Sequence, residues 1–257
     1  MSLVSTPAVV LQTYRYSETS KVVRLATRDL GVQSAIAKGA LRPKSRFGAG
    51  LELLSEGTAQ LYFRETRELH TLAAFDVIDL RRDLAADVGR FAGATALAEV
   101  MLRMAPPAAV PAAYDVLLAA LDALASAPEE AADAAAARGL WLLVAALGFG
   151  VSLDTCVKDG APVAPDGERA ILFSTSEGGV LCANCEPSDS PTRLPPRAYQ
   201  DLVALNDPAA ALPALDPAHA AAHRRLAARF ARHHLGDAPG RLPALDFWER
   251  RAWAAAS

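Results

Sequence analysis

Two short cysteine-bearing segments have the residue types and spacing that bind a metal. Cys182-Ala-Asn-Cys185 holds two thiols two residues apart, and thiolates at this spacing can bind one tetrahedral ion such as Zn²⁺. Cys156-Val-Lys-Asp159 has the same spacing with an aspartate in the second position, and 22 residues separate the two segments. Aspartate is an accepted zinc ligand, although a hard carboxylate is less usual than a thiolate in a structural site. Two interpretations stay open: a degenerate zinc site of three cysteines and one aspartate, and a decayed site whose thiols only pack.

A cationic segment, residues 38–50, has the residue types that bind phosphate. No acidic residue occurs between Asp29 and Glu52, whereas four cations lie in the segment: Lys38, Arg42, Lys44 and Arg46. Its three glycines and one proline exclude a helix and predict a loop. Uncompensated cations suit a nucleic-acid backbone, because each cation that pairs with a phosphate releases a condensed counterion. The alternative is an ordinary solvated surface loop.

The residues around this loop predict strands. Five runs are rich in β-branched and aromatic residues, alternate in polarity and are separated by turn residues: 8–14, 21–27, 31–37, 52–63 and 70–78. Five short strands without an intervening helix predict a small barrel or sandwich. An oligonucleotide-binding (OB) barrel is one candidate and an SH3-like barrel is another.

Helical periodicity begins near Arg81 and predicts an all-α unit. One helix stops before Pro106-Pro107, a second starts at Pro111, and a third starts at Glu129 and Glu130, where carboxylates suit the positive end of the dipole. Residues 141–144 are apolar on every side, which places the third helix at the buried centre. Residues 148–196 are loop-rich and carry all three cysteines.

The last predicted helix has clear end signals. Asp216 can cap it, Pro217 takes its first turn and Gly236 ends it, and a short helix over 199–205 precedes it. Its arginines, from Arg224 to Arg232, allow three interpretations: a second DNA patch, a dock for an acidic partner tail, or a solvated helix face. We expect His219 and His223, four residues apart, to be exposed and without a third metal ligand.

Composition and charge limit the class of protein. The chain has 257 residues, of which 52% are apolar and 21% charged, and these values predict two or three globular units. Residues 1–82 hold 12 Lys and Arg against 8 Asp and Glu, whereas residues 83–257 hold 14 against 21. No secretory signal is visible, and the most apolar run, 139–151, is shorter than the roughly 20 residues that span a bilayer. We therefore expect a cytoplasmic protein with reduced cysteines and no membrane partner.

Catalytic motifs are not evident in the sequence. It contains no glycine-rich phosphate loop, no GxSxG elbow and no HExxH pair, and its histidines cluster far from the cysteines. We therefore expect a binding protein rather than an enzyme.

The order and spacing of several short motifs resemble the bacterial RecO family of recombination mediators over nearly the whole chain. The likeness rests on these segments: Ala8-Val-Val-Leu11, Tyr16 to Thr27, Gly31, Lys38-Gly39, Ser45-Arg46, Leu147-Gly148-Phe149, Leu153-Asp154-x-Cys156, Phe173-Ser174 and Gly178-Gly179-x-x-Cys182-x-x-Cys185. The sequence departs from the family pattern at Asp159, where members with intact sites carry cysteine.

The resemblance implies an α+β multidomain fold. Its expected parts are an N-terminal OB-fold barrel (1–80), a helical domain (81–147), a zinc-ribbon-like, cysteine-bearing loop insert (148–194), and C-terminal helices that pack on the helical domain (195–257). It also implies a DNA repair protein that binds single- and double-stranded DNA without sequence preference and anneals complementary strands at the nucleoid. Its expected partners are RecR and the single-stranded-DNA-binding protein, with which it loads recombinase on coated single strands.

Carried over to this chain, the resemblance nominates DNA-contact residues: Lys21, Arg24, Lys38, Arg42, Lys44, Arg46 and Phe47. Four aromatic residues of the barrel are candidates to stack on bases: Tyr14, Tyr16, Phe47 and Tyr62. Of these we favour Phe47, between Arg46 and Gly48, whereas we expect Tyr14 and Tyr62, which lie on strand patterns, to fill the barrel core. Rival interpretations are an adaptor whose barrel binds protein through an apolar groove, and a specific RNA binder. The sequence leaves the RecR-binding face and the oligomeric state open.

Overall fold

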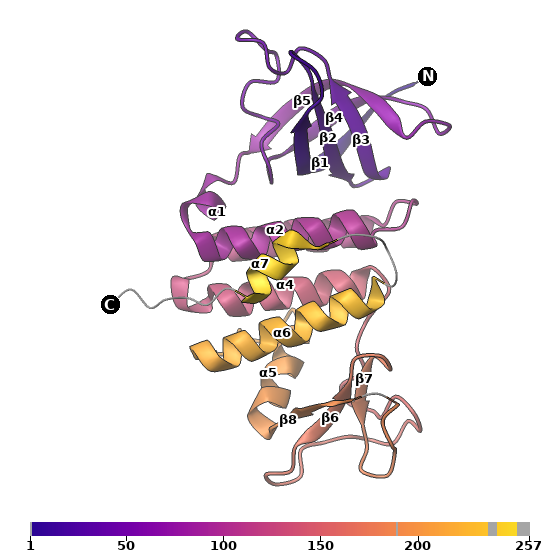
Figure 1. Ribbon diagram of the computed structural model, residues 1–257, viewed down its shortest axis with the longest axis vertical. Helices are drawn as coiled ribbons and strands as arrows, with labels where there is room; N and C mark the ends of the chain where they lie inside the picture. The colour runs from indigo at the N-terminus through magenta and orange to yellow at the C-terminus, as the bar shows by residue number, and fades with distance from the viewer. Residues whose placement is uncertain (1, 189, 236–240, 251–257) are drawn as a thin grey trace.

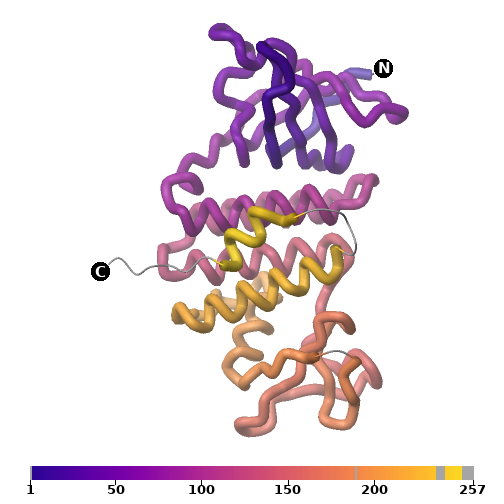
Figure 2. Tube along the Cα trace, viewed as in Figure 1, coloured from indigo at the N-terminus to yellow at the C-terminus, as the bar shows by residue number. Residues whose placement is uncertain are grey.

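The computed structural model describes residues 2–188, 190–235 and 241–250. The molecule is elongated, with a β-barrel at one end, a layer of helices in the middle and a small cysteine-bearing sheet at the other end (Figures 1 and 2). In the described ranges, no helix is both long enough and apolar enough to span a membrane.

Five strands close into the barrel, in the order β1-β2-β3-β5-β4. Their bounds are β1 Ser2–Arg15, β2 Lys21–Thr27, β3 Gly31–Ala37, β4 Glu56–Phe63 and β5 Leu69–Asp79. The β3–β5 pair is parallel and the other pairs are antiparallel. β1 is long enough to pair with β4 from Ser2 to Val9 and with β2 from Ala8 to Arg15, and the β1–β2 pairing has a register shift between Val10 and Gln12. The five predicted strand runs are all present.

The two faces of the barrel wall pack into different cores. Inward-facing residues such as Val23, Leu25 and Leu61 form a core inside the barrel. Outward-facing Val9 and Ala26 instead belong to the core of the helical layer, because α2 covers this part of β1 and β2. The barrel therefore has one outer side that is buried against the helical layer.

The helical layer follows the predicted order, with a break near its start. Its helices are α1 Arg82–Ala86, α2 Val88–Met104, α3 Pro111–Ser126, the short 3₁₀ helix η1 Glu129–Ala131, α4 Ala132–Ala146, α5 Pro196–Asn206, α6 Pro217–His234 and α7 Pro243–Arg250. Asp87 separates α1 from α2 and caps α2, since its side chain accepts a hydrogen bond from the Arg90 amide. Val88 and Phe91 lie at helical spacing with the buried residues of α2 but are both exposed.

The helical core centres on α4, as predicted. Trp141 and Val144 are buried, and the Trp141 ring meets Phe230 of α6 at 5.0 Å and Phe173 at 6.3 Å between ring centroids. The α6 start signal is also present, because the Asp216 carboxylate accepts hydrogen bonds from the amides of Ala218 and His219. The predicted stop, Gly236, lies outside the described residues. Helix α7 is an additional element that the sequence reasoning missed.

The cysteine-bearing segment contains a sheet that the sequence reasoning also missed. It consists of β6 Ile171–Ser174, β7 Gly179–Leu181 and β8 Thr192–Leu194, in the order β7-β6-β8. These strands are three or four residues long, too short to show a period, and their pairing depends on tertiary contacts. A bridge between Ser152 and Gly179 ties the segment after α4 to β7.

Arg81 joins the barrel to the helices. Its side chain is 2% exposed and contacts Glu56 of β4 and Asp122 of α3, each at 2.5 Å. The residue has a φ of 48°, in the left-handed region, and its amide donates to the Asp79 carboxylate at 2.7 Å. A second link, between Arg28 and Asp115 of α3 (2.8 Å), lies at the β2–β3 turn.

Candidate nucleic-acid interface and metal centre

The loop between β3 and β4 presents its four cations to solvent. Lys38, Arg42, Lys44 and Arg46 are exposed, and none of them pairs with a carboxylate in the part of the chain that the structure describes. Tight turns shape the loop, with the Arg42 amide donating to Gly39 and the Gly48 amide donating to Ser45. The predicted cationic loop is therefore confirmed as structure; its binding of DNA stays a prediction.

Phe47 has a different place from the one expected. Its side chain is 3% exposed and packs with Leu51 inside the barrel core, and the Arg46 guanidinium covers its ring at 5.1 Å. A base cannot reach a ring in this position, so the expectation that Phe47 stacks on bases is wrong for this structure. Phe47 is instead the anchor that holds the cationic loop onto the barrel.

Lys21 and Arg24 both lie on β2, and of the two only Lys21 has a carboxylate partner among the described residues. Lys21 donates to Glu52 at 3.2 Å, so part of its charge is compensated. Arg24 lies between Gln12 of β1 and Ser34 of β3 on the outer wall, and its Nε is buried without a hydrogen-bond partner among the described residues. Of the two, Arg24 keeps the greater capacity for a phosphate.

A hollow of about 310 Å³ connects the β1–β2 turn to the cationic loop. Its lining is mostly polar: Tyr16, Ser17, Thr19, Ser20, Ile36, Lys38, Gly39 and Arg42. The Leu41 amide donates to the Thr19 carbonyl at 3.0 Å, which holds the two loops together. Two cations and four hydroxyl-bearing side chains around one hollow suit an anion such as a phosphate.

The exposed aromatic side chains of the barrel are tyrosines. Tyr14 is 47% exposed, Tyr16 61% and Tyr62 41%, so the expectation that Tyr14 and Tyr62 fill the core was wrong. The sequence did carry a signal for this outcome, since Tyr14 shares its alternation parity with Gln12 and Tyr62 shares it with Gln60. The barrel core is filled instead by small aliphatic side chains and by Phe47 and Phe75.

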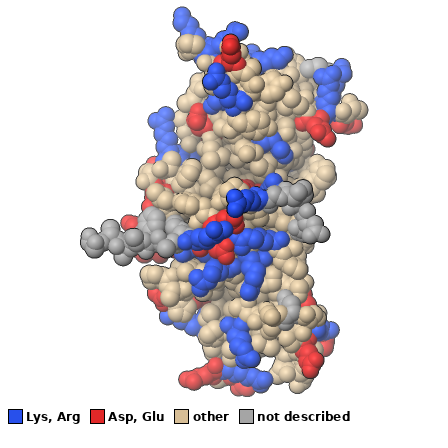
Figure 3. Space-filling view, in the orientation of Figure 1, with Lys and Arg blue, Asp and Glu red and all other residues tan. Residues whose placement is uncertain are grey.

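The arginines of α6 mostly tie helices together. Figure 3 shows Lys and Arg gathered over α6 and α7 with acidic side chains among them. Arg224 is 5% exposed and donates to Asp133 of α4 at 2.6 Å, while Arg232 contacts Asp246 and Glu249 of α7. The interpretation of this set as a solvated face is therefore wrong for Arg224.

Arg225 and Arg229 of α6 are exposed, and Arg229 also donates to Thr192 of β8. A role of these two side chains in binding DNA or an acidic tail stays a prediction.

His219 and His223 do not form an exposed pair. His223 is 2% exposed, and its Nε2 lies 3.8 Å from an Asp201 oxygen on α5. His219 contacts the Asp216 carboxylate at 2.5 Å through Nδ1. Burial lowers the pKa of His223, which favours the neutral ring at its position between α5 and α6.

The cysteine cluster brings together all four predicted ligands. One ligand atom from each of Cys156, Asp159, Cys182 and Cys185 lies within 4.8 Å of the others. Cys156 is buried and the other three side chains are accessible to different degrees. Three sulfurs and a carboxylate oxygen at this separation match the donor set and the compactness of a four-coordinate zinc site.

Hydrogen bonds fix the orientation of the Asp159 carboxylate in this cluster. Its Oδ1 accepts from the Ala161 amide at 3.0 Å, and its Oδ2 accepts from the Cys182 thiol at 3.4 Å. The Ala161 amide, followed by the neighbouring thiols, lowers the pKa of Asp159 to about 2. Asp159 is therefore a fixed carboxylate with one oxygen directed at the sulfurs.

Neighbouring thiols and backbone amides shift the pKa values of Cys156 and Cys185. The thiol of Cys182, acting through a hydrogen bond, raises the pKa of Cys185 to about 12. Burial acts to raise the pKa of Cys156, yet the amides of Cys182, Asp159 and Lys158 bring it below its ordinary value. A divalent cation would compete with the thiol protons for these sulfurs.

Lys158 fastens the two cysteine segments together. Its ammonium donates to the Glu186 carbonyl at 2.5 Å and to the Ser188 hydroxyl at 3.1 Å, and it pairs with Glu177 at 3.1 Å. Lys158 stands between the first two ligands, whereas Glu186 directly follows Cys185. The sequence reasoning missed this contact, because the spacing of the cysteines does not show which segment Lys158 faces.

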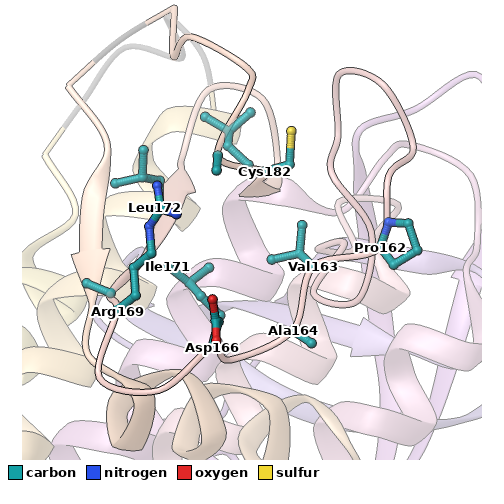
Figure 4. A pocket seen from close by; sticks show the side chains of 11 residues that line it. Pro162, Val163, Ala164, Asp166, Arg169, Ile171, Leu172 and Cys182 are labelled. Carbon is teal, nitrogen blue, oxygen red and sulfur yellow. The ribbon is translucent and has the colours of Figure 1, made fainter.

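A hollow of about 260 Å³ lies beside the cluster, between loop 162–170 and strands β6 and β7. Figure 4 shows Asp166 and Arg169 on its rim, while the Cys182 sulfur points away from it. The hollow is thus separate from the cysteine cluster, although Cys182 contributes to both.

Comparisons with known proteins match nearly the whole chain. Family models described as "Recombination protein O N terminal" and "Recombination protein O C terminal" match residues 1–81 and 85–243. The DNA repair protein RecO of Anaeromyxobacter sp. (strain K) is 37% identical over 245 residues, 92% of this chain and 93% of the relative. The DNA repair protein RecO of Rubrobacter xylanophilus is 32% identical over 244 residues, 93% of this chain and 94% of the relative.

Proposed function

Since the chain belongs to the RecO family, we propose that it is a DNA repair and recombination mediator that binds DNA through the outer wall of its barrel. One observation carries the proposal: four exposed cations on loop 38–50 have no described carboxylate partner, whereas the arginines of α6 and the barrel–helix junction are largely paired. Such cations attract a phosphate backbone of any sequence.

We assign the barrel to the OB-fold class, an assignment supported by its five strands and their closure in the order β1-β2-β3-β5-β4. We also propose four functional parts, with the barrel over 1–80, helices over 81–147, the cysteine-bearing insert over 148–194 and the C-terminal helices over 195–257. A lack of base-specific contacts would let the protein hold single- and double-stranded DNA alike.

The mediator role follows from backbone binding. A protein that holds phosphates leaves base edges free, so two bound complementary strands can anneal. In this proposal RecR and the single-stranded-DNA-binding protein act with the chain at the nucleoid, where they help to load recombinase on coated strands. The chain contributes binding and positioning and no catalysis of its own.

We further propose that the cysteine cluster is a structural zinc site. Cys156, Asp159, Cys182 and Cys185 would hold the ion, which would cross-link the segment after α4 to the β7 turn. The fixed carboxylate of Asp159 supports metal binding over a decayed site.

Fluorescence anisotropy of a labelled oligo-dT, titrated with protein at several salt concentrations, tests the DNA-binding proposal. We expect affinity to fall linearly with log salt and to be competed equally by unrelated sequences. Changing Lys38, Arg42, Lys44 and Arg46 together to Ala should weaken binding and flatten the salt slope by about 0.7 per lost phosphate contact.

The matched control changes Arg169 and Arg193, exposed cations at the cysteine-bearing end of the molecule, to Ala. An unchanged slope in the loop variant would remove loop 38–50 from the DNA site. Failure of the unmodified protein to bind at low salt would instead favour the adaptor function, in which the barrel binds protein.

A further inference from the structure

Cross-strand registers place two exposed tyrosines at the ends of one row on the barrel's outer wall. Tyr14 of β1 is opposite Val22 of β2, which is opposite Ile36 of β3. Ile36 is opposite Thr71 of β5, and Thr71 is opposite Tyr62 of β4. Residues directly opposite each other point to the same face of a sheet. All five side chains therefore point outward in one line across the strands.

Because the strands are tilted, the row advances along the barrel axis as it passes from strand to strand and does not close into a ring. It returns to β1 at Leu3, the partner of Tyr62, eleven residues before Tyr14. This displacement is the stagger of a barrel with tilted strands, and a line perpendicular to tilted strands climbs the barrel wall. Four steps between neighbouring strands, at about 4.8 Å each, separate the two tyrosines by roughly 19 Å along the surface.

The residues in the middle of the row are less exposed than the tyrosines at its two ends. Val22 is 3% exposed and Ile36 and Thr71 are partly exposed, whereas the tyrosines are 47% and 41% exposed. The α2 helix covers the outer wall near Ala26, two positions beyond Arg24 on β2, and the core on that side includes none of the five residues of the row. Ile36 and Thr71 are therefore the accessible part of a shallow floor with an aromatic ring at each end, and Val22 is buried beside them.

Cations stand on both sides of this floor. On one side, the neighbouring outward row contains Arg24, opposite Ser34 and Gln12. On the other side, Lys38 directly follows the end of β3, two residues after Ile36, and it is exposed and lines a hollow together with Tyr16 and Arg42. Successive outward positions on a strand are about 6.6 Å apart, so each cation lies within reach of a backbone that follows the floor.

We propose that a single strand of DNA crosses β2, β3 and β5 along this row, with its bases stacked on the rings of Tyr14 and Tyr62. This inference rests on the proposed DNA-binding function and adds to it the residues that hold the bases. Stacking uses the face of a base and accepts any base, so it is compatible with sequence-independent binding. The flanking cations hold the phosphates on either side of the floor.

Oligomers with and without bases separate stacking from phosphate binding. Anisotropy would be measured with a labelled dT oligomer and with an abasic oligomer of equal length. Tyr14→Ala and Tyr62→Ala should each weaken dT binding by roughly 5- to 150-fold, the range expected for the loss of one base–aromatic stack. Both variants should keep the salt slope of the unmodified protein and its affinity for the abasic oligomer, because no phosphate contact is lost.

Two control variants complete the design. Tyr62→Phe keeps the ring and should bind dT like the unmodified protein. Phe247→Ala removes an aromatic side chain that is 52% exposed on α7, outside the barrel, and should not change binding. Thermal melting of each variant checks that the barrel stays folded.

Unchanged dT binding by the tyrosine variants would overturn the inference, and so would an equal loss on the abasic oligomer. In both cases the proposed DNA-binding function would stand, since the unmodified protein would still bind. Failure of the unmodified protein to bind either oligomer would overturn the proposed function itself.

Discussion

Asp159 occupies the place where a fourth thiol would complete an all-cysteine ligand set. Its carboxylate is held by the Ala161 amide and keeps one oxygen toward the sulfurs. Because its pKa is lowered to about 2, the carboxylate is ionised at every pH at which the thiols titrate. Competition between protons and metal at this site therefore belongs to the three cysteines.

We expect Asp159→Cys to retain zinc more tightly and Asp159→Ala to retain it less tightly than the unmodified chain. Loss of a direct ligand should exceed the roughly 10–100-fold loss in affinity that is typical for a residue that supports a ligand. Competition against a chromophoric chelator measures this change. Affinity should also rise from about pH 6 to about pH 8, because a higher pH removes the thiol protons that zinc must displace.

Asp166→Ala is the matched control for this prediction, since Asp166 is exposed on a nearby loop and lies outside the cluster. Equal zinc retention by Asp159→Ala and Asp166→Ala would mean that the carboxylate is not a ligand.

At the residue scale, spacing predicted correctly that Cys156, Asp159, Cys182 and Cys185 lie together, and their binding of zinc stays a proposal. Two segments of equal spacing can meet at one ion, and the structure does bring these four residues together. The burial of Phe47 in the barrel core could not be predicted from spacing, because a loop has no repeating pattern that relates sequence position to burial. The outward turn of Tyr14 could be predicted, since Gln12 shares its parity on β1.

At the scale of elements, close backbone contact at Gly179 holds the cysteine-bearing sheet together. A Cβ on this residue would lie 2.4 Å from the Ser152 carbonyl oxygen and 2.7 Å from Val157. Ser152 in turn accepts a hydrogen bond from the Val180 amide and donates to Gly178. Glycine at this position allows the segment after α4 to lie against β7.

We expect Gly179→Ala to destabilise the protein by about 1–3 kcal/mol, the usual cost of overpacking. The clash is with a backbone oxygen that cannot rotate away, so the bridge from Ser152 to β7 must open. Urea denaturation measures the loss. Gly150→Ala is the control, because a Cβ there would meet only Ala145 at an ordinary 3.9 Å; similar midpoints for both variants would contradict this account.

The long elements were predictable from sequence and the short ones were not. Barrel strands and the helices around Trp141 have enough residues to show a period, and the Asp216–Pro217 start of α6 has a local chemical cause. Strands β6 to β8 and helix α7 are three to eight residues long and are stabilised by contacts with distant segments. The pattern of polar and apolar residues within such a short segment carries no information about its contacts with distant segments.

At the scale of the whole molecule, Arg81 connects two bodies that have separate cores. Its guanidinium is buried between Glu56, on the barrel, and Asp122, on α3. Glu56 is itself 17% exposed, whereas Asp122 is 61% exposed, so the barrel side of the contact is the less hydrated one. The buried part of this network fixes the orientation of the barrel on the helical layer.

We expect Arg81→Ala to lower the free energy of unfolding by roughly 2–4 kcal/mol, because Glu56 would keep its charge with little water and no partner. Urea denaturation, followed by tryptophan fluorescence and by far-ultraviolet circular dichroism, measures the loss. Arg82→Ala, an exposed neighbour, should stay within about 0.5 kcal/mol of the unmodified chain. A similar loss in both variants would contradict the role of Arg81.

The elongated shape and the uneven charge together make the molecule an electric dipole. The barrel end, residues 1–82, has 12 cationic against 8 acidic residues, and the rest of the chain has 14 against 21. If the chain binds DNA as proposed, the field of this polyanion would turn the molecule before contact, barrel first, and raise the fraction of collisions that lead to binding. The same torque would turn the cysteine-bearing end away from the nucleic acid and leave it open to the surrounding solution.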